Sequence, residues 1–274
     1  MTKDYVKAYS VHGALLSPYS DKDSVGNCRF CGSDDHFMVN MSNGQFRCLH
    51  CEERGNLYTF LRHIWNEART RTEPRQYRDL SCERGISADT LSRFVAYDSH
   101  THHWMLAVES HVFSGEDGGG RGSWKLTNIR SWVDLDGKGK LLGTPTCKSH
   151  VFNAEALTTK PRRVYFCEGE WDAMALIDCD PPDDVAILGV PGAGYSLAAW
   201  ISTFPFPLTD TEAVLLYDHD RPGTQGSLRF LQKKPQARIL LWDDEKPKGY
   251  DIRDLVNSGI PSSEVWEYIH KHLV

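Results

Sequence analysis

The sequence predicts an α/β protein with a small N-terminal zinc ribbon, a mixed α+β middle region and a C-terminal parallel sheet. Three observations predict this arrangement. Four of the eight cysteines form two close pairs near the N-terminus. From residue 161 onward, apolar strand-like runs alternate with helix-like runs, which is typical of a parallel sheet covered by helices. Acidic residues follow directly after two of those strand-like runs.

The bulk composition fits a globular protein. The 274 residues are enough for one large domain or two smaller ones, and a hydrophobic content of 40% can support packed cores. The sequence has no apolar run of about 18 residues, so we expect no membrane span. The start, MTKDYVKAYS, does not have the charged-then-apolar order of a secretion signal. We therefore expect a cytoplasmic protein.

The net charge of −6 is unevenly distributed. Residues 1–159 carry 19 basic and 19 acidic side chains, whereas residues 160–274 carry 12 and 18. Clustered carboxylates repel one another unless a cation lies among them, so a metal site is expected in the C-terminal part. Residues 54–84 contain seven arginines against four acids. This segment can form a basic patch for phosphates, and a solvated charged face explains it equally well.

Residues 1–66 are predicted to form the zinc ribbon. The pairs Cys28/Cys31 and Cys48/Cys51 are separated by sixteen residues, and four thiolates in this pattern close a tetrahedral zinc site without an open position. Metal binding would hold together a module that is too small to bury a sufficient core. The intervening FMVNMSNGQFRC predicts a hairpin with Asn43-Gly44 at the turn.

Aromatic and basic residues surround the cysteines and permit base stacking and phosphate contact. Zinc ribbons also serve as structural or protein-docking modules, so these residues do not by themselves indicate nucleic acid. The residues concerned are Phe30, Phe37, Phe46, Arg29, Arg47 and His50.

The ribbon is predicted to end in a helix over 57–65, with Asn56 as its N-cap. Residues 67–79 are polar, charged and interrupted by Pro74, so we expect a linker there. Residues 80–160 predict a mixed α+β region. It would contain a short helix after Ser87, three β-like runs (WMLAVES, HVFSG and SWKLTNI) and a glycine-rich turn, EDGGGRG.

Residues 161–274 predict the parallel sheet. The strand-like runs are RRVYFCE, DVAILGV, AVLLYDHD and ARILLW, and the helix-like runs between them are DAMALID, SLAAWIST and GSLRFLQKK.

Acidic residues stand where this sheet should bind ligands. The first strand ends in Glu168, with Glu170 and Asp172 close behind, and the third ends in Asp218 and Asp220. Ligands of an open parallel sheet bind at the carboxyl ends of its strands. Residues i and i+2 of an extended segment face the same side, so Asp218 and Asp220 should point to one spot.

Two further segments bear on this site. Asp251 and Asp254 lie at a later helix start, and such a set of carboxylates calls for Mg²⁺ or Mn²⁺. For any single acid at a strand end, a helix cap is the alternative explanation. The glycine loop 189–194 lacks the Gly-Lys-Ser/Thr of a Walker motif, so we do not expect an ATPase.

Together these motifs resemble the DnaG-type primases of bacteria and phages, most closely the primase portion of phage primase–helicases. The cysteine pairs followed by GNLYTFL resemble the zinc-binding domain of that family. EGEWDAMAL (168–176) and YDHDRPG (217–223) resemble the two signature motifs of its TOPRIM domain, with GVPGAG and YDIRDLV in the places of the glycine loop and the last acidic motif. ERGIS (83–87) and SWKLTNIR (123–130) resemble its basic subdomain.

The resemblance implies a DNA primase that makes short RNA primers on single-stranded DNA from ribonucleoside triphosphates for DNA replication. It implies a zinc-binding domain (1–66), a linker (67–79), the N-terminal subdomain of the RNA polymerase domain (80–160) and a TOPRIM catalytic subdomain (161–274). The implied cofactors are one structural Zn²⁺ and catalytic Mg²⁺ or Mn²⁺. The implied setting is the cytoplasm of a bacterium or of a phage-infected host.

The resemblance also implies roles for individual residues. The implied catalytic residues are Glu168, Glu170, Asp172, Asp218 and Asp220; the magnesium ligands Glu168, Asp218, Asp220 and Asp251; the zinc ligands Cys28, Cys31, Cys48 and Cys51; and the nucleotide or template contacts Arg84, Lys125 and Arg130.

Two alternatives share the same acidic residues. The chain could be a TOPRIM metal-dependent nuclease, or a non-catalytic accessory protein that binds the template. No helicase motif is present, so unwinding is expected from a separate replicative helicase, and the module could serve a phage or another mobile element.

Overall fold

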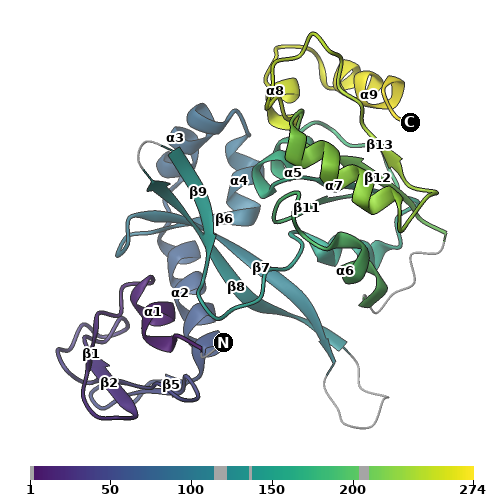
Figure 1. Cartoon of the computed structure of the whole chain (residues 1–274). Helices are drawn as coiled ribbons and strands as arrows, with labels where there is room; N and C mark the ends of the chain where they lie inside the picture. Colours follow the sequence, from purple (N-terminus) through teal and green to yellow (C-terminus); the bar gives the residue numbers. More distant parts are fainter. Residues whose placement is uncertain (1–2, 114–121, 136–137, 204–209) are drawn as a thin grey trace. The chain divides into compact units, whose positions relative to one another are not determined.

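The computed structural model describes residues 3–113, 122–135, 138–203 and 210–274 (Figure 1). They belong to two compact units, each built from several segments of the chain. The first unit comprises Met1–Gln76, Phe94–Val108 and Leu126–Ser149, and the second Tyr77–Arg93, Glu109–Lys125 and His150–Val274. The division into four successive segments stays a prediction. The glycine-rich turn expected at 116–122 lies outside the described residues, apart from the backbone of Gly122.

The first unit contains the predicted ribbon as a five-stranded antiparallel sheet in the order β1-β2-β3-β4-β5. The predicted hairpin is confirmed by the pairing of β3 with β4. Gly44, at the turn of this hairpin, has a φ of +72°, and a Cβ there would overlap the ring of Tyr5. Both the backbone conformation and the available space therefore require glycine. The strands are β1 Leu16–Pro18, β2 Asp23–Gly26, β3 Phe37–Asn40, β4 Phe46–Cys48 and β5 Arg54–Gly55.

Two helices, α1 (Tyr5–Ser10) and α2 (Leu57–Arg71), pack with this sheet. The predicted cap is confirmed: the side chain of Asn56 accepts a hydrogen bond from the Thr59 backbone N–H at 3.0 Å. The apolar residues of α2 recur at helical spacing and are buried, so this face of α2 forms the core of the first unit. They are Leu57, Phe60, Leu61, Ile64 and Ala68.

The segment 67–79, expected as a linker, is mostly helical. Its first residues complete α2, and α3 (Pro74–Arg84) begins after only Thr72 and Glu73. Pro74 occupies the first position of α3. Its missing N–H has no helical partner at that position, so proline starts this helix without breaking one.

The middle of the chain forms an antiparallel arrangement. The sheet has the order β6-β7-β8-β9, with antiparallel pairing of β6 with β7 and of β8 with β9. The helix predicted after Ser87 is α4 (Ala88–Phe94). Two β-like runs expected as separate, WMLAVES and HVFSG, form one continuous strand as far as Phe113. The strands are β6 Val95–Asp98, β7 His103–Phe113, β8 Gly122–Leu135 and β9 Lys138–Gly143.

The second unit contains the predicted parallel sheet, in the order β11-β10-β12-β13. In this register Cys167 pairs with Gly189 on one side and Leu216 on the other, so Glu168 and Asp218 follow adjacent strands. The run ARILLW forms a much shorter strand than predicted. The strands are β10 Arg163–Cys167, β11 Val185–Gly189, β12 Glu212–Leu216 and β13 Arg238–Ile239.

Helices connect these strands, as the alternating pattern predicts. The strands and helices share a buried apolar cluster. It includes Val164, Phe166, Leu188, Leu215 and Phe230, all nearly inaccessible to solvent. The helical segments of the second unit, besides α3 and α4, are η1 Ala154–Thr159, α5 Glu170–Ile177, α6 Leu197–Thr203, α7 Arg221–Leu231, α8 Ile252–Val256 and α9 Ser262–Lys271.

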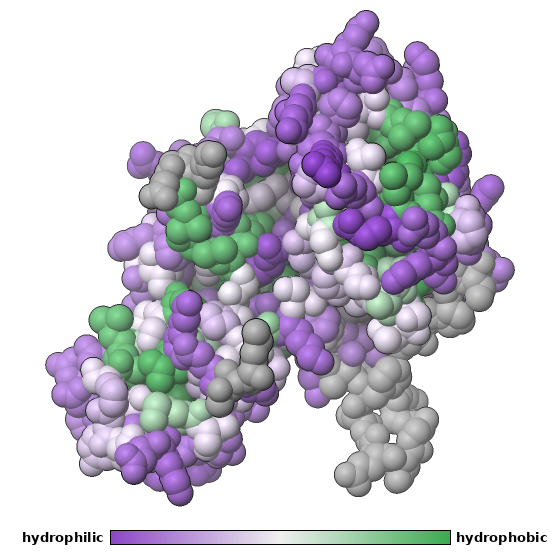
Figure 2. Space-filling view, viewed as in Figure 1, coloured by the Kyte–Doolittle hydropathy of each residue, from purple (hydrophilic) through white to green (hydrophobic). Residues whose placement is uncertain are grey.

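Among the described residues, no helix is both long and apolar enough to cross a membrane. The face of the molecule in Figure 2 is largely hydrophilic, with apolar residues gathered in separate patches.

Candidate functional site

The four paired cysteines form one compact cluster. Their sulfur atoms all lie within 4.8 Å of one another. The Sγ atoms of Cys28 and Cys51 are 3.8 Å apart, as are those of Cys31 and Cys48. A tetrahedral zinc site with Zn–S bonds of ~2.3 Å requires sulfur–sulfur edges of about 3.8 Å. The donor set and its spacing therefore fit Zn²⁺.

The backbone around the cysteines also favours thiolates. The N–H groups of His50 and Cys51 point at the Cys48 sulfur, at 3.4 and 3.5 Å. A hydrogen bond from the Ser33 side chain, together with its backbone, lowers the pKa of the Cys31 thiol to about 5. Such donors stabilise the charged sulfur that a metal requires.

Most of the aromatic residues near the cysteines are not available to stack on bases. Phe37 and Phe46 are 0% and 4% exposed, and their rings pack at 5.1 Å inside the ribbon core. Phe30 packs against both of them. The idea that these rings contact nucleic acid is therefore wrong for Phe37 and Phe46. The ribbon uses them to build a core that the zinc alone does not supply.

Arg29 is buried too, and it holds an ion-pair network instead of a phosphate. Its guanidinium donates to Asp98 at 2.6 Å and to Glu67 at 2.9 Å, and the side chains of Arg29 and Asp98 are each 1% exposed. We expect Arg29→Met to destabilise the zinc-loaded chain by about 3–5 kcal/mol, because the Asp98 carboxylate would remain buried without its partner. Denaturant unfolding measures this effect. Arg47→Met, at an exposed position of β4, should change stability by less than about 0.5 kcal/mol.

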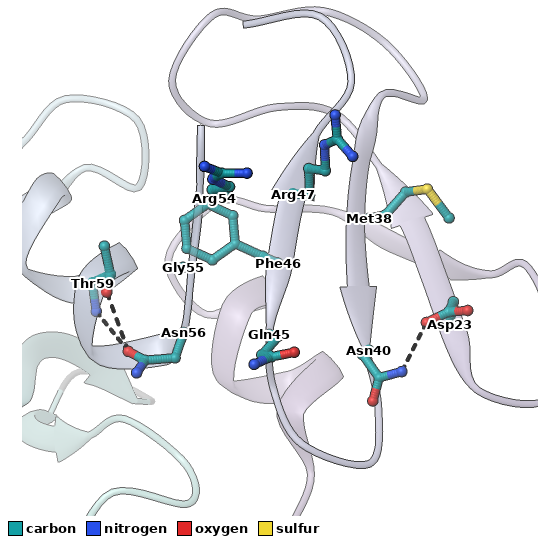
Figure 3. A pocket seen from close by; sticks show the side chains of 10 residues that line it. All are labelled: Asp23, Met38, Asn40, Gln45, Phe46, Arg47, Arg54, Gly55, Asn56 and Thr59. Atoms are coloured by element: carbon teal, nitrogen blue, oxygen red, sulfur yellow. Dashed lines mark hydrogen bonds between the residues drawn. The ribbon is translucent and has the colours of Figure 1, made fainter. Parts of the chain in front are cut away.

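The ribbon carries an open cavity of about 530 Å³. Figure 3 shows its walls: Met38 and Arg47 come from the paired strands β3 and β4, and Asn56 and Thr59 from the start of α2. An Asn40–Asp23 hydrogen bond of 3.1 Å holds one rim. The lining residues are Asp23, Met38, Asn40, Gln45, Phe46, Arg47, Arg54, Gly55, Asn56 and Thr59.

The structure brings Glu168 and Asp218 together at the carboxyl edge of the parallel sheet. One oxygen of Glu168 accepts a hydrogen bond from the backbone N–H of Asp218, and the other accepts from the N–H of Ala193, each at 3.2 Å. The glycine loop thus holds the carboxylate of the neighbouring strand. Gly223 packs closely here, since a Cβ there would overlap the Asp218 carbonyl oxygen and touch Glu168.

Electrostatics shows that more acids converge on this edge. Burial, together with the charges of Asp172, Glu168, Asp251 and Asp220, raises the pKa of Asp218 to about 8. Burial and the charge of Asp251 raise the pKa of Asp172 to about 7. Carboxyl groups with such pKa values are destabilised as anions, and a bound cation relieves that destabilisation.

Asp220 and Asp251 also act as N-caps of helices. Asp220 caps α7, accepting from the Gly223 N–H at 2.7 Å. Asp251 caps α8 in a capping box with Asp254 and also binds the Arg253 guanidinium at 3.2 Å. The capping alternative is thus correct for both residues, and each still lies close enough to raise the pKa of Asp218.

The remaining acid of the predicted set is Glu170. It is 3% exposed at the start of α5, where its backbone lies against Gly189 of the neighbouring strand. Among the described residues, only the cysteines place three or more donor atoms within 4.8 Å of one another. Mg²⁺ needs fewer protein ligands than this, because it usually takes one or two carboxylates and completes its shell with water and substrate phosphates.

The three predicted basic contacts differ in character. Arg84 is largely packed away, with its guanidinium 4.9 Å from the Trp171 ring and 3.0 Å from Glu83, and burial lowers its pKa. Lys125 is exposed on β8. Arg130 belongs to the first unit, donates to the Leu141 carbonyl at 2.8 Å and has its pKa lowered to about 10 by burial.

Two groups at this site were not predicted. Arg253 donates its backbone N–H to Asp172 and holds Asp251 with its guanidinium, and Ala193 donates its backbone N–H to Glu168. Arg253 stands between Asp251 and Asp254 in the sequence, and a basic residue within an acidic motif was the available signal. No pattern in the sequence marks the N–H of an alanine.

The fold is similar to that of solved structures, although no known family profile and no curated protein matches the sequence. Among solved structures, the DnaG catalytic core matches with a TM-score of 0.56 and 16% identity, over 79% of this chain and 78% of that one. The DnaG primase catalytic domain bound to ssDNA matches with a TM-score of 0.56 and 15% identity, over 79% and 81%.

A longer match has a TM-score of only 0.48: the Aquifex aeolicus primase with its zinc-binding and RNA polymerase domains, at 14% identity over 99% of this chain and 84% of that one. The two matches with TM-scores of 0.56 show the fold, and the parallel sheet with acids at its carboxyl edge is consistent with a TOPRIM fold. More particularly, the chain has the fold of the DnaG primases, as the sequence motifs predicted.

The crowded carboxylates lead to a prediction on stability. Asp218 has a folded-state pKa near 8, above its ordinary value of 3.8, so its contribution to stability is complete below pH 4 and is lost as the pH rises through 8. In metal-free buffer, Asp218→Asn should therefore stabilise the chain on the order of 1–3 kcal/mol at pH 8–9 and not at pH 4. Thermal melts across this range measure the difference. Exposed Asp183→Asn is the control, and a pH-independent effect of Asp218→Asn would contradict the prediction.

Proposed function

We propose that this protein is a DNA primase that joins ribonucleotides into short RNA primers on a single-stranded DNA template. The observation that carries the proposal is the hydrogen bond from the Asp218 backbone to Glu168, which joins the acidic ends of two adjacent strands. In a sheet with the DnaG fold, this edge gathers the carboxylates that a nucleotidyl transfer needs.

Within this proposal the acidic residues have distinct tasks. Asp218 and Asp220 hold divalent cations, with Glu168 and Asp251 as further ligands. A bound Mg²⁺ or Mn²⁺ supplies neutralisation of the incoming triphosphate. Asp172 and Glu170 lie behind this edge in α5, and Arg253 keeps Asp172 and Asp251 in place through its two hydrogen bonds. Fixed positions matter because in-line attack by the primer 3′-hydroxyl requires closely set distances.

Glu168 has a further capacity besides metal binding. Burial raises its pKa, and the two backbone N–H groups that it accepts from oppose that rise. A carboxyl group poised in this way can accept the proton of the attacking hydroxyl. The two N–H donors hold both of its oxygens at the edge of the sheet, so the group does not need to reorganise before reaction.

The zinc ribbon is proposed to bind the template. Its cavity offers the Gln45 amide for hydrogen bonds to bases and two guanidinium groups, from Arg47 and Arg54, for phosphates. Lys125 and Arg130 stay proposals as nucleotide or template contacts, and Arg84, packed on Trp171, fits that role less well. The DnaG catalytic domain was solved bound to ssDNA, which supports a single-stranded template. A separate helicase as partner, a place in replication and a cytoplasmic setting in a bacterium or phage-infected host complete the proposal.

One assay tests the proposal against both alternatives. The zinc-loaded full chain is incubated with single-stranded DNA of varied sequence, labelled ribonucleoside triphosphates and Mg²⁺. Short RNA products that require both template and metal are expected. Cleaved DNA without synthesis would identify a TOPRIM nuclease instead. Template binding with neither activity, across the templates and with Mn²⁺ as well, would identify an accessory protein.

A further inference from the structure

One segment, residues 242–250, holds the backbone on both sides of Asp218. Before Asp218, the Trp242 indole N–H donates to the Tyr217 carbonyl at 2.8 Å. After it, the His219 N–H donates to the Tyr250 carbonyl, and the Gly249 N–H donates to the His219 carbonyl, each at 2.8 Å. The main chain at Asp218 is thus fixed from its two neighbours by a single stretch of chain.

This segment has no helix or strand of its own, so side chains determine its shape. The Trp242 and Tyr250 rings meet edge to face at 5.2 Å, and Trp242 also lies 6.1 Å from the Tyr268 ring. Lys246 joins the two tyrosines: its Nζ is 4.6 Å from the Tyr250 ring centre and 5.4 Å from that of Tyr268. An ammonium placed over aromatic faces is attracted by their π-electrons.

The cluster is anchored to α9 as well. The Tyr268 hydroxyl donates to Asp243 at 3.1 Å, and His272 lies 3.0 Å from the same carboxylate. The four residues Trp242, Lys246, Tyr250 and Tyr268 are all half-buried. Lys246 is the one charged side chain among them, and it contacts the rings of both Tyr250 and Tyr268.

We propose that Trp242, Lys246, Tyr250 and Tyr268 form an aromatic clamp that positions Asp218 for a divalent cation, with Lys246 closing the clamp. The inference rests on the proposed function for the metal, and it concerns positioning residues that touch neither metal nor substrate. Tyr250 has a double effect, because it pairs with His219 and directly precedes Asp251. The clamp therefore sets the spacing between the two acidic segments.

Direct metal binding tests the clamp without relying on activity. Mn²⁺ binding to the zinc-loaded full chain is measured by electron paramagnetic resonance for the wild type, Lys246→Met, Lys246→Arg and Lys248→Met. Lys248 is an exposed lysine of the same segment and is the matched control. We expect Lys246→Met to raise the Mn²⁺ dissociation constant roughly tenfold, and Lys246→Arg to restore it, because arginine also stacks on aromatic rings. Lys248→Met should bind as the wild type does.

Synthesis assays add a second readout. Lys246→Met should need about tenfold more Mg²⁺ for half-maximal synthesis and reach nearly the wild-type rate at saturation, since the catalytic groups remain. Equal Mn²⁺ affinity of Lys246→Met and the wild type, equal losses in both lysine variants, or no Mn²⁺ binding to the wild type would each overturn the clamp. If Mn²⁺ binding depends on Lys246 but no primers form, the clamp stands and the proposed function fails. If primers form and Lys246→Met binds Mn²⁺ as the wild type does, the proposed function stands and the clamp fails.

Discussion

Asp218→Ala is expected to abolish RNA synthesis while leaving the protein folded. A divalent ion held at this carboxylate contributes several kcal/mol to the transition state, and each ~1.4 kcal/mol corresponds to a factor of ten in rate. The expected loss is therefore about three orders of magnitude or more. The protein stays folded because removing one of several crowded carboxylates relieves their repulsion. Primer formation on single-stranded DNA, with melting curves in parallel, measures both effects.

Asp220 allows a finer version of this experiment. Asp220→Ala should also abolish synthesis, and it should lower stability by about 1 kcal/mol because the cap of α7 is lost. Asp220→Asn keeps a capping oxygen but loses the charge, so synthesis should fall while stability is retained. Exposed Asp183→Ala is the control. Undiminished synthesis in both the Asp218 and Asp220 variants would mean that the catalytic site lies elsewhere.

Cys48→Ser is expected to remove zinc and unfold the ribbon. Metal binding contributes on the order of 10–16 kcal/mol to small zinc modules, more than such a module can replace by packing. We expect the zinc-to-protein ratio to fall from one to near zero. Hydrogen exchange should accelerate in β2 to β4 and leave β10 to β12 of the second unit protected. Cys82→Ser, at an exposed cysteine outside the cluster, should retain both zinc and protection.

The functional consequence should be selective. Affinity for single-stranded DNA should fall more than the rate of nucleotide joining on a preformed primer–template, because the acidic residues belong to the second unit. The buried cluster of the ribbon also includes Ala96, Met105 and Ile129, so the adjoining strands of the first unit should lose some protection. An equal loss of template binding and nucleotide joining would show that zinc supports the whole fold.

The sequence by itself determined the features that depend on local order. Cysteine spacing predicted the cluster, since two Cys-x-x-Cys pairs joined by a hairpin are typical of a structural zinc site. The apolar strands alternating with helices predicted the parallel sheet. In such a sheet the strands end at the same edge, so Glu168 and Asp218 were expected at that edge. The structure decided that β10 and β12 are neighbours and that the two residues therefore meet.

The tertiary structure decided what depends on contacts between distant segments. The sequence permitted a phosphate contact for Arg29, but in the structure Arg29 pairs with Glu67 and Asp98. It also permitted base stacking by Phe37 and Phe46, but these rings pack in the ribbon core. Composition cannot show burial, because the same side chain serves a core or a ligand according to what packs on it. The contacts of Trp242 and Tyr250 beside Asp218 span 25 and 31 residues of sequence. Only folding brings such groups within hydrogen-bond distance, and no local pattern encodes it.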